Sequence, residues 1–121
     1  MTVERKVDLF NKWVSILGLD DWEIHYNLAC QISDLIIEDA AGECVYNEVT
    51  KSGTIRILSE EEYRKLSSSF EFDFEKTLVH ELLHLKFCLL DDTSNSLQER
   101  VLHQLIDEIA CALVNSWRRD W

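Results

Sequence analysis

Apolar residues recur at helical spacing along the first part of the chain. Five of them lie three or four positions apart, as on one face of an amphipathic helix: Val3, Val7, Phe10, Val14 and Leu17. Thr2 precedes this run and can cap its first turn, whereas Gly18 follows directly after its end. We therefore expect a first helix over residues 3–17.

The pattern then changes to alternation between apolar and polar positions. The apolar side of this second segment consists of Trp22, Ile24, Tyr26, Leu28 and Cys30. A period of two is typical of a half-buried strand, and it places His25 on the solvent side. Residues 43–49 and 53–58 are further strand-like runs, and the turn-forming residues between them predict that the two strands are joined. The stretch 31–40 fits either a loop or a short helix.

The remainder of the chain has helical periodicity. Residues 59–62 open a short acidic helix, and Ser69 is a suitable cap for a longer helix over about 70–90. A polar break at 91–96 separates that helix from a last one over about 97–117. One helix, three strands and then further helices predict an α+β fold.

The composition agrees with one folded domain over residues 1–121. The apolar share of 46% and the charged share of 29% are those of an ordinary globular protein. The chain contains no proline and only three glycines, so no segment has the composition of a linker. A chain of this size can bury a core but has no room for a second folded module.

The charge and the ends of the chain exclude several classes of partner. The net charge is −11 and no cluster of lysine and arginine offers a phosphate-binding face, so we expect no nucleic acid partner. No apolar run approaches membrane-spanning length, and the first residues do not resemble a signal peptide. The four cysteines form no CxxC pair, and each lies among apolar residues, which predicts buried, reduced thiols. These features predict a cytoplasmic protein without a membrane partner.

The segment 80–84 reads HELLH, an intact HExxH motif within an apolar helical run. His80 and His84 are four residues apart, so both side chains project from one face of a helix and both imidazoles can reach one metal ion. Glu81 is close enough to take a proton from a water molecule bound to that metal without being a ligand itself. Zinc lowers the pKa of such a water from about 15.7 to roughly 7. The motif therefore predicts a Zn²⁺ site that hydrolyses a peptide bond, with His80 and His84 as ligands and Glu81 as general base.

A catalytic zinc site needs a third protein ligand. The longer motif HExxHxxGxxH of metzincins is excluded, because Phe87 occupies its glycine position and Leu90 its third histidine position. We therefore expect the third ligand to come from the last helix, which offers four candidates: Glu99, His103, Asp107 and Glu108. Helical geometry places His103 and Glu108 at the two edges of the apolar stripe. By geometry alone the two residues are almost equally good candidates for the third ligand. Tyr46 and Tyr63 could stabilise an oxyanion, but no sequence pattern places either of them near the metal.

Three segments together resemble a known group of proteins. Residues 22–24 (WEI), 53–57 (GTIRI) and 77–85 (TLVHELLHL) are similar to the minimal zincin-like metallopeptidases, which include small gluzincin-type proteins of phages and bacteria and, more distantly, SprT-like domains. The resemblance implies a short, mainly three-stranded sheet packed on the HExxH helix, with helices at both ends of the chain. It also implies that a peptide or protein substrate binds along the edge strand.

The resemblance also bears on the third ligand. In the gluzincin-type proteins a later helix carries a glutamate in a pattern like E-x-x-I-D-x-[IL]-A, which matches residues 103–110 (HQLIDEIA). His103 stands at the glutamate position, and SprT-like sites use a third histidine. The resemblance thus favours His103 as the third metal ligand, ahead of Glu108. The nucleic-acid-binding extensions of SprT-like proteins have no counterpart in this acidic chain.

Two other functions fit parts of the same pattern. A zinc-stabilised interaction module without catalytic activity would use the histidines to fix the fold, but it would have no need of Glu81. An acidic interaction protein that binds no metal would leave two histidines and a glutamate unexplained inside an apolar helix. The leading hypothesis is a zinc-dependent metallopeptidase whose substrate specificity and oligomeric state the sequence leaves open.

Overall fold

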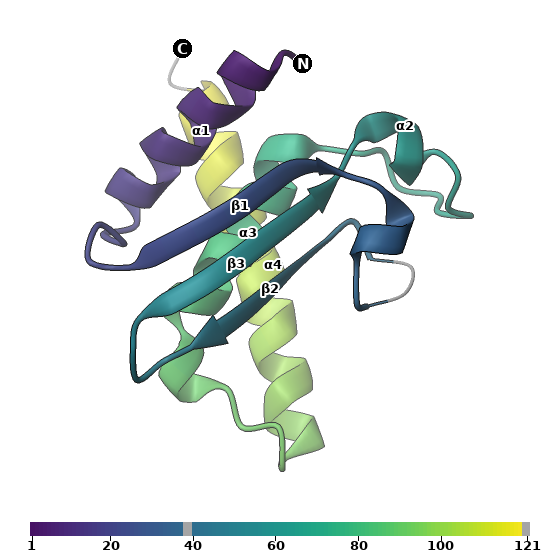
Figure 1. The fold of residues 1–121 in the computed structure, drawn as a ribbon. Helices are drawn as coiled ribbons and strands as arrows, with labels where there is room; N and C mark the ends of the chain where they lie inside the picture. Colours follow the sequence, from purple (N-terminus) through teal and green to yellow (C-terminus); the bar gives the residue numbers. More distant parts are fainter. Residues whose placement is uncertain (38–39, 120–121) are drawn as a thin grey trace.

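The computed structural model describes residues 1–37 and 40–119. Within these ranges the chain forms the following elements: α1 (Val3–Ile16), β1 (Glu23–Cys30), β2 (Gly42–Asn47), β3 (Ser52–Leu58), α2 (Glu60–Tyr63), α3 (Phe74–Lys86) and α4 (Ser96–Arg119), with short 3₁₀ turns at Ile32–Asp34 and Cys88–Leu90 (Figure 1). The predicted α+β class and the order of the strands and helices are confirmed. Part of the ambiguous stretch 31–40 lies outside the described residues.

The three strands form one mixed sheet in the order β1-β3-β2. β2 and β3 pair in antiparallel fashion through the predicted turn, with Gly42 opposite Ile57 and Asn47 opposite Ser52. β1 pairs with β3 in parallel. β2 therefore forms one edge of the sheet, and one row of its backbone groups has no strand partner among the described residues.

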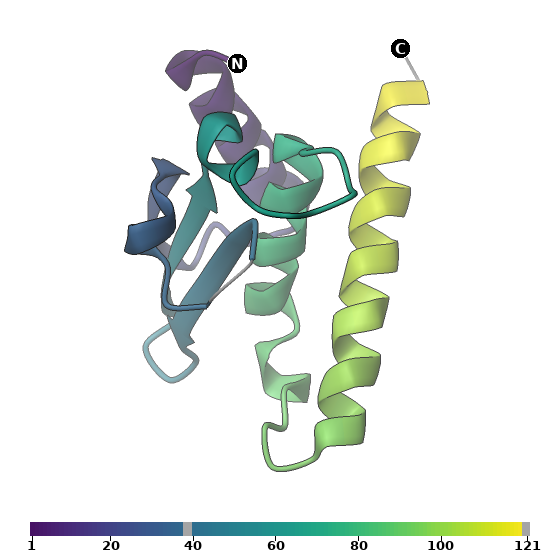
Figure 2. The same cartoon turned by 90° about the vertical axis from the view of Figure 1, so that its right-hand side faces the viewer.

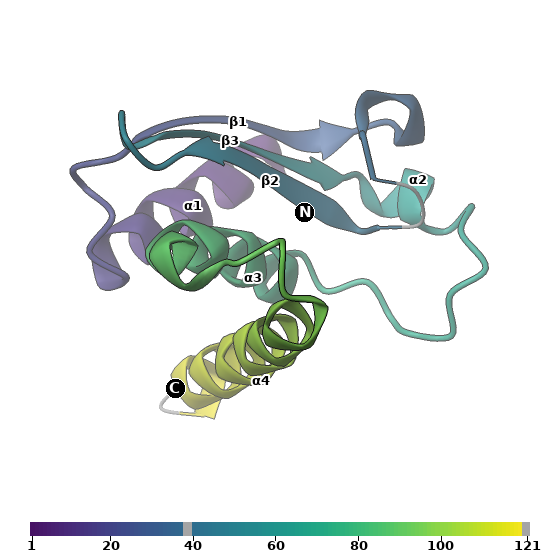
Figure 3. The same cartoon turned by 90° about the horizontal axis from the view of Figure 1, so that it is seen from below.

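The helices lie in two layers on one face of the sheet. Seen from below, α1 and α3 lie against the sheet, and α4 packs on the far side of α3 (Figure 3). A side view shows α3 and α4 side by side, with α3 between the sheet and α4 (Figure 2). α3 is accordingly the central element, and its Leu78, Val79 and Leu82 are fully buried together with Ile55 and Ile57 of β3.

The ends of α1 and α4 agree with the sequence, whereas the start of α3 does not. Thr2 caps α1 by accepting a hydrogen bond from the backbone N–H of Arg5, and Gly18 follows its end with a φ of 68°. The predicted cap of the motif helix, Ser69, is wrong, because Asp73 caps α3 by accepting a hydrogen bond from the N–H of Lys76. An earlier start would gain no core contact, since Phe70 is 80% exposed.

The end of α3 and the cysteines also differ in part from the prediction. α3 ends at Lys86 instead of continuing to residue 90, and the chain turns through Cys88–Leu90 before α4. All four cysteines are free. Cys30 and Cys88 are buried as predicted, but Cys44 is half-buried and Cys111 is exposed on α4, so the expectation of four buried thiols was wrong for these two.

A buried carboxylate joins the three long helices. Glu75, in the first turn of α3, accepts hydrogen bonds from Trp13 Nε1 at 2.6 Å and Lys12 Nζ at 2.9 Å, both on α1. Arg118, near the end of α4, contacts the other Glu75 oxygen at 3.4 Å and also binds both oxygens of Asp73 at 2.8 and 2.9 Å. The start of α3 is thus the point at which α1 and α4 are fixed.

The described helices include none that combines the length and the apolar character needed to cross a membrane.

The Glu75 junction predicts a pH-dependent contribution to stability. Burial raises the pKa of the Glu75 carboxyl, but the hydrogen bonds from Trp13 and Lys12 outweigh burial and hold the pKa below its ordinary value of 4.5. A carboxyl with a lowered pKa stabilises the folded state above the unfolded pKa, and this contribution is lost as the pH falls through the folded pKa.

We expect Glu75→Gln to lower the free energy of unfolding by about 2 kcal/mol at pH 7, because it removes charged hydrogen bonds to three partners. The difference from the wild type should shrink below pH 4.5. Urea denaturation at pH 7 and at a pH below 4.5 measures the difference in the free energy of unfolding. Glu71→Gln, at an exposed position just before the helix, is the matched control, and an equal loss in both variants would contradict the role of the junction.

Candidate metal centre

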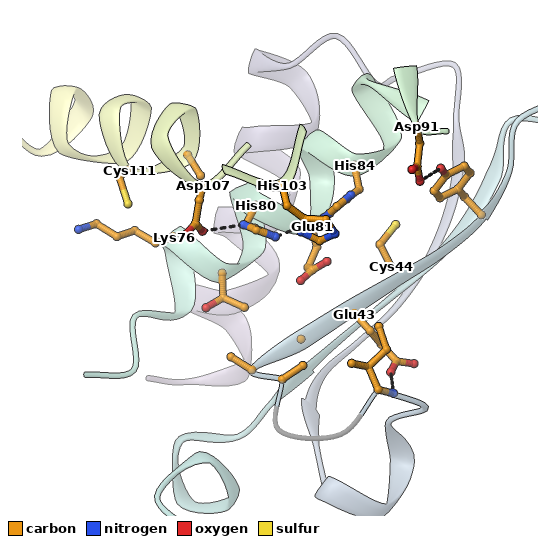
Figure 4. Close-up of a pocket in the computed structure, with 17 residues that line it drawn as sticks. Glu43, Cys44, Lys76, His80, Glu81, His84, Asp91, His103, Asp107 and Cys111 are labelled. Carbon is orange, nitrogen blue, oxygen red and sulfur yellow. Dashed lines mark hydrogen bonds and ion pairs between the residues drawn. The ribbon is translucent and has the colours of Figure 1, made fainter. Parts of the chain in front are cut away.

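The two motif histidines lie one above the other on α3. Their ring centroids are 5.0 Å apart, and His80 Nε2 is 3.2 Å from His84 Nε2. Both rings are partly buried and point toward the cavity between α3, α4 and the sheet (Figure 4). The helical spacing of HExxH therefore brings two imidazole nitrogens to one point.

His103 of α4 completes a group of three imidazoles. Its ring centroid lies 4.7 Å from that of His84 and 6.0 Å from that of His80. One nitrogen from each of the three histidines lies within 4.8 Å of the other two. His103 was the preferred third ligand in the sequence prediction. The structure brings it close to His80 and His84, although His103 itself is an exposed residue.

The other third-ligand candidates lie elsewhere. Among the described residues, the group of metal-ligating atoms includes none of the three acidic alternatives on α4. Glu99 and Glu108 do not line the cavity at all. Asp107 does line it, but its carboxylate lies behind His80, where Oδ1 is 2.9 Å from His80 Nδ1.

The spacing of the two motif histidines fits a tetrahedral metal ion. Two imidazole nitrogens that each lie about 2.0–2.1 Å from a tetrahedral ion are about 3.3 Å apart. The separation between His80 Nε2 and His84 Nε2 is 3.2 Å. Imidazole ligands suit zinc, and they also suit copper, iron and nickel. The three histidines thus form a possible transition-metal site whose metal the geometry alone does not select.

Asp107 prepares His80 for that role. When the neutral imidazole donates its Nδ1 proton to the Asp107 carboxylate, Nε2 keeps its lone pair and faces the other histidines. A carboxylate behind a ligating histidine is a common partner that orients the ring. Asp107 was one candidate ligand in the sequence, and this supporting position was not predicted, although its spacing of four from His103 places both on one face of α4.

Burial favours the neutral form of the two motif histidines. It lowers the pKa of His80 even though the adjacent Asp107 acts in the opposite direction. It also lowers the pKa of His84 to about 4, with further contributions from His80 and His103. Neutral imidazole is the form that binds a metal, so these two side chains need lose no proton at neutral pH to act as ligands.

Glu81 is buried beside the histidines without a partner of its own. The residue is 6% exposed, and its carboxylate forms no hydrogen bond or ion pair with any of the described residues. Burial, followed by the negative charges of Glu43 and Asp107, raises the pKa of Glu81 to about 8. The carboxyl group faces the cavity (Figure 4) and is poised to exchange a proton close to neutral pH.

Glycine at the start of β2 makes room for this carboxylate. A Cβ atom at Gly42 would lie 3.0 Å from the backbone oxygen of Arg56, 3.1 Å from Thr77 Cγ2 and 3.4 Å from Glu81 Oε2. The backbone oxygen belongs to the paired strand β3 and cannot easily move. The absence of a side chain at Gly42 thus lets the edge strand approach the motif helix closely.

The site opens into a cavity of about 430 Å³. Residues 37 and 40–44 border it on the side of the sheet, α3 forms its floor, and His103, Asp107, Ala110 and Cys111 of α4 border the opposite side. Tyr46 lies at one end and donates a hydrogen bond to Asp91 Oδ2 at 2.9 Å. No sequence pattern placed Tyr46 or Tyr63 near the predicted metal site. The alternation of Gly42, Cys44 and Tyr46 along β2 was the available signal for this wall.

Glu43 fixes the entrance of the cavity. Its side chain is fully buried, forms an ion pair with Arg56 at 3.0 Å, and accepts hydrogen bonds from the N–H groups of Ile36 and Ile37. These bonds join the segment before β2 to the sheet. Glu43 was not singled out in the sequence, because only the pairing of β2 with β3 places Arg56 opposite it.

The raised pKa of Glu81 predicts how the metal-free protein responds to pH. The folded chain holds a proton on Glu81 up to about pH 8, whereas the unfolded chain releases it near 4.5, so stability falls as the pH rises between these values. Glu81→Gln removes this loss because glutamine carries no charge.

We expect metal-free Glu81→Gln to melt about 5 °C above the metal-free wild type at a pH above 8 and close to it at pH 4.5. Thermal denaturation in the presence of a chelator measures the difference. Glu108→Gln, which changes an exposed carboxylate outside the cavity, should show no such pH dependence. A difference between Glu81→Gln and the wild type that is constant with pH would contradict the burial of a protonated Glu81.

Comparison of the chain with protein-family models, with curated proteins and with solved structures found no match in any of the three. The function must therefore be inferred from the chemistry of the site itself.

Proposed function

We propose that this protein is a zinc-dependent metallopeptidase of the zincin-like type. The observation that carries the proposal is the position of an unpartnered carboxylate, Glu81, beside three histidine nitrogens that lie within 4.8 Å of one another at the wall of an open cavity. His80, His84 and His103 would hold the metal. The small sheet packed on the motif helix agrees with the implied fold.

Zinc bound to the three imidazoles would acidify a water molecule, polarise a carbonyl oxygen and favour the ionised form of Glu81. Glu81 then accepts a proton from the attacking water at its carboxylate and later gives it to the departing amine nitrogen. Asp107 holds the Nδ1 proton of His80 throughout. Gly42 keeps the edge strand close enough to bury Glu81 without covering it.

The edge strand supports a peptide as the substrate. β2 borders the cavity, and one row of its N–H and C=O groups has no strand partner among the described residues. An extended peptide can pair with such an edge through backbone hydrogen bonds, which need no particular side chains. This arrangement would lay a peptide bond across the cavity beside Glu81.

A purely structural metal site fits the geometry less well. Closed zinc sites usually have four protein ligands. The group of ligating atoms in the described part of the chain contains three histidines and no fourth member. A structural site would also give no role to the Glu81 carboxylate, which lines the open cavity.

The charge and the thiols of the protein support the cytoplasmic location and the lack of a nucleic acid partner that we propose. A net charge of −11 opposes binding to nucleic acids, and four free cysteines suit the reducing conditions of the cytoplasm.

The identity of the third ligand can be tested by metal content. We expect His103→Ala to lower the affinity for zinc by about 100-fold or more, because it removes a ligand and not merely a supporting group. Glu99→Ala and Glu108→Ala are matched controls on the same helix and should retain the metal. Mass spectrometry of each purified protein under native conditions measures the bound zinc, and loss of metal from Glu108→Ala alone would assign the ligand differently.

The catalytic role of Glu81 can be separated from metal binding. We expect Glu81→Gln to bind zinc as the wild type does and to hydrolyse peptides about 10²- to 10⁴-fold more slowly, since it cannot accept a proton. Turnover of quenched fluorescent peptides, normalised to bound zinc, measures this effect. Equal turnover in the wild type and the variant would rule out Glu81 as the base and, with it, the proposed mechanism.

A further inference from the structure

The cavity has charges of opposite sign at its two ends. Lys76 lies at the end near the start of β2, and Asp91 lies at the other end beside Tyr46 (Figure 4). The three histidines and Glu81 lie between them. Any extended ligand that fills the cavity therefore meets a cation at one end and a carboxylate at the other.

Lys76 is the only lysine or arginine among the described residues that line this cavity. It is half-buried, and its ammonium group forms no ion pair with another described residue. The acidic groups around the cavity already have partners in three cases, since Arg56 binds Glu43, Tyr46 binds Asp91 and His80 binds Asp107. A cation that forms no ion pair, at one end of an otherwise acidic cavity, is suited to an anionic group of the ligand.

The position of Lys76 relates it to the reacting centre. It precedes His80 by four residues, so the two residues lie one turn apart on α3, about 6 Å along the axis. The Lys76 side chain extends away from the histidines, toward the outer end of the cavity (Figure 4). An extended peptide advances about 3.4 Å per residue. Because the four-carbon stem of lysine is flexible, the ammonium group of Lys76 can meet a group on the first or second residue beyond a peptide bond held beside the histidines.

The direction of β2 determines which side of the substrate reaches Lys76. β2 runs from Gly42, which lies beside Thr77, to Tyr46, which binds Asp91. An antiparallel partner strand, the slightly more stable arrangement, runs the opposite way. Its N-terminal part lies at the Asp91 end and its C-terminal part at the Lys76 end.

We propose that Lys76 binds a carboxylate of the substrate, located one or two residues to the C-terminal side of the bond that is cleaved. This inference rests on the proposed peptidase function. The carboxylate is either the free C-terminus of a peptide or the side chain of an aspartate or glutamate, because both present the same anion. Lys76 is thus a specificity-determining residue, and the preferred substrates are short peptides or segments with an acidic residue at that position.

Four pools of acetylated peptides with a randomised central segment distinguish the two sources of the carboxylate. The first pair differs only in ending with a free carboxylate or with an amide. The second pair ends with an amide and carries either glutamate or glutamine at one internal position. Cleavage is followed by mass spectrometry with zinc-loaded protein. Binding is followed separately by fluorescence anisotropy with the zinc-loaded Glu81→Gln variant, so that recognition is measured without turnover.

We expect the wild type to favour one carboxylate pool over its neutral partner about fivefold in kcat/KM, chiefly through KM. Lys76→Met should abolish this preference and keep the bound zinc and the cleavage of the neutral pools. Lys76→Glu should reverse it. Lys86→Glu, which changes an exposed lysine of the same helix outside the cavity, should retain it.

Two results would overturn the inference: equal cleavage and binding of the charged and neutral pools by the wild type, or an unchanged preference in Lys76→Met. If no pool is cleaved but a carboxylate pool binds through Lys76, the peptidase proposal fails while the ligand class stands. If the neutral and the charged pools are cleaved at equal rates, the peptidase proposal stands and the role of Lys76 fails.

Discussion

The packing of α4 against α3 is the constraint on which the whole site depends, because only α4 supplies a third imidazole. Two features set the position of α4. A stripe of buried residues every four positions, Leu102, Ile106, Ala110 and Val114, fixes which face of the helix meets α3. The ion pairs of Arg118 with Asp73 and Glu75 fix its position along the axis. His103 and Asp107 each follow a residue of the stripe, so both lie at the border between the core and the cavity.

The same packing creates an energetic conflict that favours a metal ion. α3 is a core helix, yet it carries two histidines and a glutamate at its centre, where burial lowers the pKa of the histidines and raises that of Glu81. One nitrogen from each of three imidazoles lies within 4.8 Å of the other two. A divalent ion would satisfy the imidazole lone pairs and the buried carboxylate together. Binding of the proposed metal would therefore offset part of the cost of burying these groups on a core helix.

The sequence predicted the elements of the fold well, because periodicity reports local structure. Helix α1, the three strands and α4 follow directly from apolar spacing, and HExxH on a helix is sufficient to bring His80 and His84 together. Tertiary contacts decided the rest. The carboxylate of Asp73, which caps α3, also binds Arg118 from far away in the sequence, and periodicity carries no information about that pair. For the same reason, spacing alone could not decide between His103 and Glu108 as the third ligand. That choice depends on which face of α4 packs against α3.

A glycine in the edge strand, Gly42, connects the packing of the sheet with the properties of Glu81. Gly42 begins β2, lies against Thr77 and Glu81 of the motif helix, and is paired with Ile57 through the backbone. A larger residue would push β2 away from α3, expose Glu81 to water and so return its pKa toward that of an ordinary carboxyl. The next residue, Glu43, holds the segment before the strand through two backbone N–H groups. The raised pKa of Glu81 therefore depends on the distance between a strand and a helix, and the residues that set this distance lie outside the HExxH motif.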